Sequence, residues 1–153
     1  ILELDNSDVR SSIALATKFI YELVDAGKVK LVFKDDYRKR IAYHTPCHME
    51  KLGWAIYSTS LVKMIPGVDF NMLDSQCCGI AGTYGFKKEH YEDSQKIGEG
   101  LFRQIRDLNL DMVATDCETC KWQIEMSTGV QVENPISIIA DALDVEATQK
   151  ANR

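Results

Sequence analysis

Five cysteines stand in three groups along the chain, and cysteine sulfur is both a metal ligand and a redox-active nucleophile. Cys47 is alone, Cys77 and Cys78 are adjacent, and Cys117 and Cys120 form a Cys-x-x-Cys pair. The chain begins with no secretory signal pattern, so a reducing cytoplasmic compartment is expected. There, grouped cysteines more often bind metal or carry redox chemistry than form structural disulfides. The cysteines therefore predict a metal or redox site.

Three kinds of site compete for these residues. A structural zinc ion takes four ligands in a closed tetrahedron and would leave one of the five cysteines unused. Thiol–disulfide exchange by Cys117 and Cys120 would leave the other three without a role. An iron-sulfur cluster is ordinarily bound by four thiolates, so a larger or irregular cluster with a bridging thiolate would use the whole set. The residues alone leave these alternatives open.

The adjacent Cys77 and Cys78 open the glycine-rich stretch CCGIAGTYG. Neighbouring side chains of an extended strand point to opposite faces, so both cysteines can serve one site only if the backbone turns there. Gly79 permits such a turn. The glycines after it leave room for backbone N–H groups to approach an anion or a sulfur-rich cluster. We therefore expect Gly79 to belong to the cofactor-binding loop.

The elements that must position these cysteines can be predicted from hydrophobic periodicity and from turn residues. Helices are expected over residues 7–27, 49–65, 87–107, 118–127 and 134–143, and the last ten residues are expected to be loose. Strands are expected over residues 28–33, 40–45, 68–74, 110–116 and 130–134.

This alternation of strands and helices predicts an α/β fold with a small parallel, Rossmann-like sheet and helices on both faces. The carboxyl ends of parallel strands lie along one edge of the sheet, where ligands collect. Each cysteine group follows a different predicted strand. We therefore expect all five thiols to meet at the C-terminal edge of the strands.

Composition and charge exclude several classes of function. The chain has 153 residues and 45% hydrophobic residues, which fits a single domain over residues 1–153. A net charge of -5 argues against nucleic acid or an anionic membrane surface as a partner. No apolar run is long enough to span a bilayer. Because the chain begins at Ile1 and not at Met, we expect it to be a fragment of a longer protein.

Several polar residues lie beside the cysteines. His44 and His48 flank Cys47, and either imidazole is a candidate to donate a hydrogen bond to sulfur and so tune a bound cluster. His48 is the stronger candidate because it stands at a predicted helix start next to the cysteine. Asp116 and Thr119 are expected to cap the helix that follows Cys117.

Three stretches resemble the family of cysteine-rich CCG domains, which are found in heterodisulfide reductases and in the iron-sulfur subunits of glycolate and lactate oxidation systems. They are HTPCH at 44–48, CCGIAGTYGF at 77–86 and DCETC at 116–120. The resemblance covers residues 40–143. Within the family, these stretches and their flanking residues most resemble the C-terminal domain of the iron-sulfur subunit of anaerobic glycerol-3-phosphate dehydrogenases.

The resemblance implies an iron-sulfur electron-transfer domain that is not catalytic alone. It would relay electrons from flavin-bearing dehydrogenase subunits toward membrane quinone, peripheral to the inner face of the cell membrane and without a membrane-spanning segment of its own. Its cofactor would be a [4Fe-4S] cluster of cubane or non-cubane form. The resemblance assigns the metal ligands to Cys47, Cys77, Cys78, Cys117 and Cys120. A dithiol or heterodisulfide reductase and a structural zinc module are the alternatives.

Overall fold

The computed structural model describes residues 5 and 7–153, and within them four parallel strands form one sheet. The spatial order of the strands is β2-β1-β3-β4. This arrangement confirms the α/β fold with a small parallel sheet. The strands are β1 (Lys39–Tyr43), β2 (Val68–Met72), β3 (Met112–Ala114) and β4 (Val132–Glu133).

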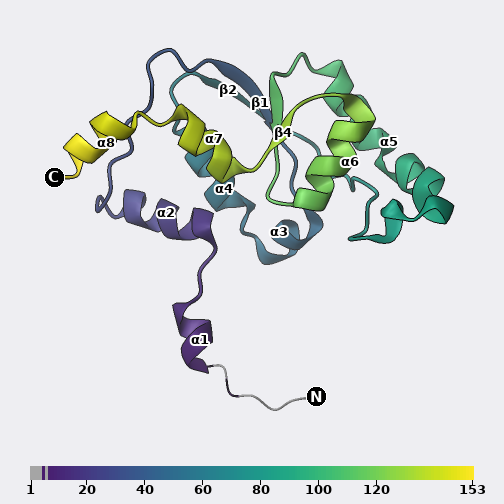
Figure 1. Ribbon diagram of the computed structural model, residues 1–153, viewed down its shortest axis with the longest axis horizontal. Coiled ribbons are helices and arrows are strands. Elements are labelled where there is room, and N and C mark those ends of the chain that lie inside the picture. Colours follow the sequence, from purple (N-terminus) through teal and green to yellow (C-terminus); the bar gives the residue numbers. More distant parts are fainter. Residues whose placement is uncertain (1–4, 6) are drawn as a thin grey trace.

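Helices cover both faces of this sheet, as the alternation predicted (Figure 1). Ile41 and Tyr43 of β1 face a core formed with α2, α4 and α7, while Ala42 between them faces a core formed with α5 and α6. This is the two-residue period of a strand with apolar partners on each side. The helices are α2 (Ala16–Asp25), α4 (Ala55–Lys63), α5 (Tyr91–Asp107), α6 (Glu118–Thr128) and α7 (Pro135–Ala142).

The strand order creates a switch point between β1 and β3. The chain leaving β1 goes to β2 on one side of the sheet, and the chain leaving β3 goes to β4 on the other. The connections therefore diverge at the carboxyl ends of these two strands, which is where ligands bind in open parallel sheets. Cys47 follows β1 and Cys117 follows β3.

Two predicted long helices are each divided in the structure. The first consists of α1 (Ser7–Ser12) and α2, and α1 lies away from the rest of the fold (Figure 1). The second consists of α3 (Cys47–Leu52) and α4, separated at Gly53, which has φ +66° and ends α3. A left-handed residue ends a helix readily when it is glycine. The helix α3 begins at Cys47, directly after its N-cap residue Pro46.

The predicted strand over residues 28–33 was wrong. This segment makes a single antiparallel bridge, between Phe33 and Leu143, and joins no sheet. Its backbone forms hydrogen bonds with the C-terminal region instead. The N–H of Val32 donates to Thr148 Oγ1 at 3.0 Å, and the carbonyl of Val32 accepts from the N–H of Asp144 at 2.8 Å. The backbone groups that a sheet neighbour would satisfy are therefore occupied by a helix terminus.

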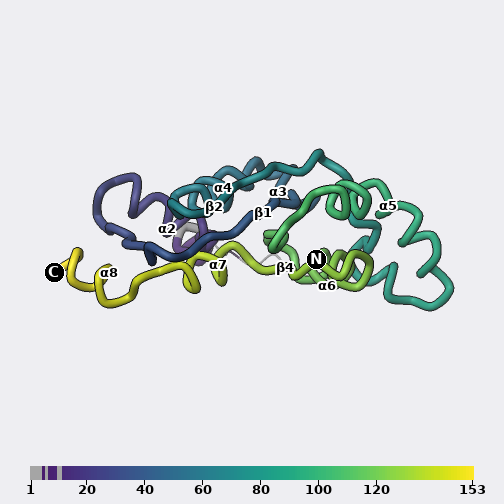
Figure 2. The backbone as a smooth tube through the Cα atoms, turned by 90° about the horizontal axis from the view of Figure 1, so that it is seen from above, coloured from purple at the N-terminus to yellow at the C-terminus, as the bar shows by residue number. Residues whose placement is uncertain are grey.

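The last ten residues also differ from the prediction, because they include the helix α8 (Val145–Ala151). The carboxylate of Asp144 caps this helix by accepting a hydrogen bond from the N–H of Ala147 at 2.9 Å. Figure 2 shows α8 at one end of an elongated molecule and α5 at the other. Two short 3-10 turns, η1 (Tyr84–Phe86) and η2 (Lys88–His90), precede α5.

Candidate metal centre

Three connections carry the cysteines, and each places them within a few residues of a strand end. Cys47 begins α3 directly after Pro46, whose fixed backbone geometry suits the position before a helix. Cys117 is the N-cap residue of α6, and Cys120 lies in the first turn of that helix. Cys77 and Cys78 lie in the irregular segment after β2.

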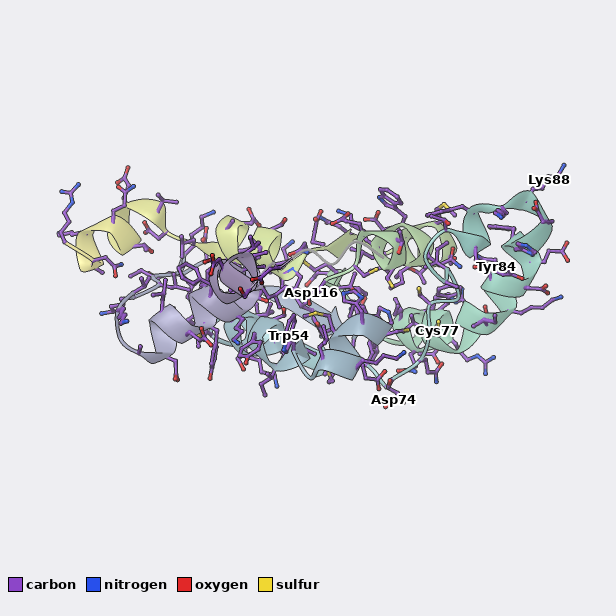
Figure 3. All side chains as sticks on the ribbon, turned by 90° about the horizontal axis from the view of Figure 1, so that it is seen from below. Trp54, Asp74, Cys77, Tyr84, Lys88 and Asp116 are labelled. Atoms are coloured by element: carbon purple, nitrogen blue, oxygen red, sulfur yellow. The ribbon has the colours of Figure 1, made fainter. Side chains whose placement is uncertain are left out.

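All five cysteines line one cavity of about 260 Å³. Sequence distances of tens of residues thus reduce to one site. Figure 3 shows Cys77 between Asp116, which lies near the middle of the molecule, and Tyr84, which lies toward one end of it. The other lining residues are Pro46, His48, Ile80, Ala81, Gly82 and Thr119.

The cavity has a buried inner half and an open outer half. Cys78 and Cys120 are 3% and 6% exposed, and their sulfurs lie 3.2 Å apart. Cys47 and Cys77 are exposed, and Cys117 is partly buried. A group bound here would therefore have one protected side and one side facing solvent.

His44 lies beside the two buried cysteines, although the sequence favoured His48 as the histidine that contacts sulfur. It is 2% exposed, and its ring nitrogen lies with the sulfurs of Cys78 and Cys120 in a group whose ligand atoms are all within 4.8 Å of one another. His48 lines the cavity but is exposed. A sequence signal did exist: His44 is two residues after Ala42, so the strand period directs both to the face of α5 and α6.

The close sulfur pair shifts the acidity of both thiols. The hydrogen bond shared with Cys120 is the largest cause that lowers the pKa of Cys78 to about 5, and His44 acts in the same direction. The same hydrogen bond and burial raise the pKa of the Cys120 thiol. At the outer half, burial raises the pKa of Cys47, and the neighbouring Cys77 adds to this effect. The Cys78 sulfur is thus prepared as a thiolate, the form that binds metal.

The turn after Cys78 packs against Ser94 of α5 and is hydrogen-bonded to it. Gly79 has φ +86°, as a turn residue requires, and a Cβ there would lie 2.0 Å from the carbonyl oxygen of Ser94. The Ser94 hydroxyl donates to the Gly79 carbonyl at 2.9 Å and accepts from Gln123 Nε2 at 2.8 Å. Since Gln123 is one turn beyond Cys120 on α6, this chain of bonds ties the two buried cysteines together.

Asp116 does not cap the helix after Cys117, contrary to the expectation, because no side-chain hydrogen bond caps that helix. Its carboxylate instead accepts hydrogen bonds from the Tyr43 hydroxyl at 2.5 Å and from the Ser58 hydroxyl at 2.8 Å. The hydroxyl oxygen of Thr119 lies 3.2 Å from the sulfur of Cys117. These bonds fix the backbone before and after Cys117.

Comparisons with known proteins identify the family of the chain. Residues 41–125 match the model of a family described as the cysteine-rich domain, CCG. The chain is 54% identical over 143 residues to one subunit of the anaerobic glycerol-3-phosphate dehydrogenase of Escherichia coli strain K12, covering 94% of this chain and 36% of that protein. Among the residues that the structure describes, no helix is long and apolar enough to cross a membrane.

Two archaeal proteins are more distantly similar. An uncharacterized iron-sulfur protein of Methanocaldococcus jannaschii is 32% identical over 111 residues, which is 71% of this chain and 22% of that protein. One subunit of the dihydromethanophenazine:CoB–CoM heterodisulfide reductase of Methanosarcina barkeri is 27% identical over 143 residues, 86% of this chain and 34% of that protein. The chain thus spans between about a fifth and about a third of the length of the relatives it matches.

Proposed function

The chain belongs to the cysteine-rich CCG domain family, and we propose that it is an iron-sulfur electron-transfer domain whose ligands are Cys47, Cys77, Cys78, Cys117 and Cys120. The observation that carries the proposal is the convergence of five sulfurs from three connections on one cavity. The donor set fits such a cluster, because thiolates are its ordinary ligands. Similarity to iron-sulfur proteins supports the same function.

When bound, an iron-sulfur cluster supplies one-electron transfer at a potential set by hydrogen bonds and solvent exposure. The chain's own residues would set both. His44 and Ile80 are both buried and lie on the protected side. The exposed Cys47 and Cys77 mark the open side, where an electron partner would approach.

Anaerobic reconstitution of the full chain with iron and sulfide tests this function. We expect several irons per chain with a matching amount of acid-labile sulfide and visible absorption. Serine variants of Cys47, Cys77 and Cys117 should each lower the iron content. Binding of a single zinc ion, with no uptake of iron in the absence of zinc, would rule the proposal out.

We further propose that the domain works in an anaerobic glycerol-3-phosphate dehydrogenase, passing electrons from flavin-bearing subunits toward membrane quinone. The support is the 54% identity to one subunit of an enzyme of that name. Mixing the loaded chain with flavin subunits and glycerol 3-phosphate should bleach the visible absorption, and a soluble naphthoquinone should restore it. If the cluster loads but is not reduced in this mixture, the proposed complex is wrong while the cluster assignment remains.

A dithiol reductase is the second candidate, because the sulfurs of Cys78 and Cys120 are close enough to exchange with a disulfide. The similarity to part of a heterodisulfide reductase supports it. The metal-free chain would then reduce a small disulfide by thiol exchange, and release of the product thiol would measure it. Turnover without iron would favour this candidate over electron transfer through a cluster.

A further inference from the structure

The segment over residues 28–33, which joins no sheet, forms hydrogen bonds along one of its edges. The N–H of Lys30 donates to Asn152 Oδ1 and its carbonyl accepts from Asn152 Nδ2, both at 2.8 Å. The backbone of Val32 and the N–H of Lys34 also form hydrogen bonds with the C-terminal region. Every second residue therefore faces the same neighbour, which is the two-residue period of an extended strand.

The opposite edge of this segment is open. The backbone N–H and C=O of successive residues in a strand point to alternate edges, so those of Leu31 and Phe33 face away from the C-terminal region. The bridge between Phe33 and Leu143 does not use them, because the neighbours of Phe33 form its hydrogen bonds. Among the residues that the structure describes, none pairs with the backbone of Leu31 or Phe33. We call these four backbone groups the open edge.

A groove of about 730 Å³ borders the open edge. Its walls come from the end of α2, from the segment itself and from the residues after α4, and among the described residues that line it Lys30 is charged and the others are apolar. Leu31 and Phe33 pack against the core but remain partly exposed. The groove can therefore receive apolar side chains from a strand that pairs with the open edge.

This surface is separate from the cavity of the cysteines. The groove and that cavity share no lining residue. Figures 1 and 2 place α2, which precedes the segment, and α8, which forms hydrogen bonds with it, at the end of the molecule away from α5. A partner bound here would leave the exposed cysteines accessible.

Lysines give the open edge a positive charge. Lys28, Lys30 and Lys34 are exposed and share one face of the segment, because they are separated by even numbers of residues. Within the described part of the chain, neither Lys28 nor Lys30 forms an ion pair. A second copy of the chain would bring like charges together, which disfavours pairing between two copies. Carboxylates on an incoming strand would be attracted to this face.

We propose that the open edge and its groove bind an extended peptide segment of a partner protein in which acidic and apolar side chains alternate. The peptide adds as a strand, and its backbone forms hydrogen bonds with Leu31 and Phe33. Its apolar side chains enter the groove on the face of these two residues. Its acidic side chains lie on the opposite face, beside Lys30 and the lysines on either side.

A fluorescein-labelled, acetylated peptide of three Glu-Val repeats is the probe, titrated with the full chain under reducing conditions and followed by fluorescence anisotropy. We expect saturable binding. In ¹H–¹⁵N spectra of the isotope-labelled chain, the amide signals of Leu31 and Phe33 should shift and that of Cys78 should not. The same peptide with lysine in place of glutamate should bind at least about threefold more weakly, since each charge pair is replaced by a repulsion.

Methylation of the peptide backbone tests strand pairing directly. Two further probes carry N-methyl groups on alternate nitrogens, on the valines in one and on the glutamates in the other, so each retains one edge that can pair. A strand bound in one direction pairs through one edge. One of these probes should therefore bind at least about tenfold more weakly than the parent peptide, because backbone hydrogen bonds are lost, while the other should bind nearly as well.

The variant Lys30→Glu reverses the charge that lines the groove and leaves the backbone of residue 30 in place. It should weaken binding of the Glu-Val peptide by at least about threefold. Lys51→Glu, at an exposed lysine of α3, changes the net charge equally and is the matched control that should bind as the parent chain does. Far-ultraviolet circular dichroism checks that both variants fold.

Three results would overturn the proposal: no saturable binding at peptide concentrations up to about 1 mM, equal binding of the two methylated probes, or equal affinity in Lys30→Glu and Lys51→Glu. Sedimentation velocity provides a fourth. A dimer whose formation shifts the amide signals of Leu31 and Phe33 would assign the open edge to a second copy. No step requires iron, so failure here leaves the electron-transfer proposal standing, and failure of cluster loading leaves this one standing.

Discussion

The sulfur of Cys78 lies 3.2 Å from the sulfur of Cys120, although 42 positions separate the two residues in the chain. Cys78 comes from the segment after β2 and Cys120 from the first turn of α6. Hydrogen bonds connect the backbone next to each cysteine. The Ser94 hydroxyl donates to the carbonyl of Gly79, which follows Cys78, and accepts from Gln123, one helical turn after Cys120. Packing behind the cavity therefore sets the distance between sulfurs inside it.

We predict that this pair forms the first disulfide when the metal-free chain is oxidised. Diamide would accept two electrons and two protons from the thiols of Cys78 and Cys120 and be reduced to the hydrazine, while one sulfur–sulfur bond forms. Proteolysis and mass spectrometry locate the bond. A bond between Cys117 and Cys120, or between Cys77 and Cys78, as the main product would contradict the prediction.

The variant Gly79→Ala should destabilise the chain strongly. Alanine at φ +86° has a backbone cost of about 1–2 kcal/mol. The added Cβ would lie 2.0 Å from the Ser94 carbonyl oxygen, so the helix start must also shift, at a further cost of about 1–3 kcal/mol. Urea denaturation of the metal-free chain measures the change in the free energy of unfolding.

Gly129→Ala is the matched control for this variant, because Gly129 has φ +73° and nothing lies within 4 Å of the added Cβ. It should lose only the backbone cost of about 1–2 kcal/mol. Equal losses in the two variants would show that the close approach to Ser94 contributes nothing.

The variant Ser94→Ala should lower the free energy of unfolding by about 1–3 kcal/mol, since it leaves a buried carbonyl of Gly79 and a buried amide of Gln123 without this partner. Ser75→Ala is the control, because Ser75 is exposed and its bond to Glu50 is at the surface. Denaturation curves of the two variants should differ clearly. A loss in Ser94→Ala no larger than that in the control would mean that water replaces the missing hydroxyl.

Much of this arrangement could be predicted from the sequence, because the relevant signals are local. Alternating apolar residues and turn residues indicated the sheet strands, and the strand before Cys47 was expected at 40–45 and lies at Lys39–Tyr43. Each cysteine group was expected to follow a strand along the chain, and Cys47 follows β1, Cys77 follows β2 and Cys117 follows β3. Gly79 was expected at a turn for the same local reason, and its φ of +86° agrees.

What escaped prediction depends on tertiary contacts. His48 was preferred over His44 because it is next to Cys47 in sequence, yet His44 is the one buried against two sulfurs from distant segments. Ser94 and Gln123 carry no motif, and their role exists only once α5 and α6 pack together. The segment 28–33 has the composition of a strand but meets α8 and no strand partner. Propensity cannot reveal which neighbour a segment finds.

Beside the site, the ion pair of Lys121 and Glu133 joins α6 to β4, with Nζ and Oε2 at 3.0 Å. The hydrogen bond from Lys121 holds the pKa of Glu133 below its ordinary value of 4.5. A carboxylate with a lowered pKa contributes stability above the pKa of the unfolded chain and loses it as the pH falls through the folded value. The pair should therefore stabilise the chain at neutral pH and not at strongly acidic pH.

The variant Lys121→Met tests this pair, with the free energy of unfolding measured by urea denaturation from pH 7 to pH 3. We expect a loss of about 0.5–1 kcal/mol at pH 7. The loss should shrink as the pH falls from 4.5 through the lowered pKa of Glu133 in the folded chain, and it should vanish below that value, where Glu133 is protonated in both states. Lys96→Met is the control: its partner Asp93 and Lys96 itself are largely exposed, so its loss at pH 7 should be smaller. A loss in Lys121→Met that stays constant with pH would assign the effect to packing of the lysine stem and not to its charge.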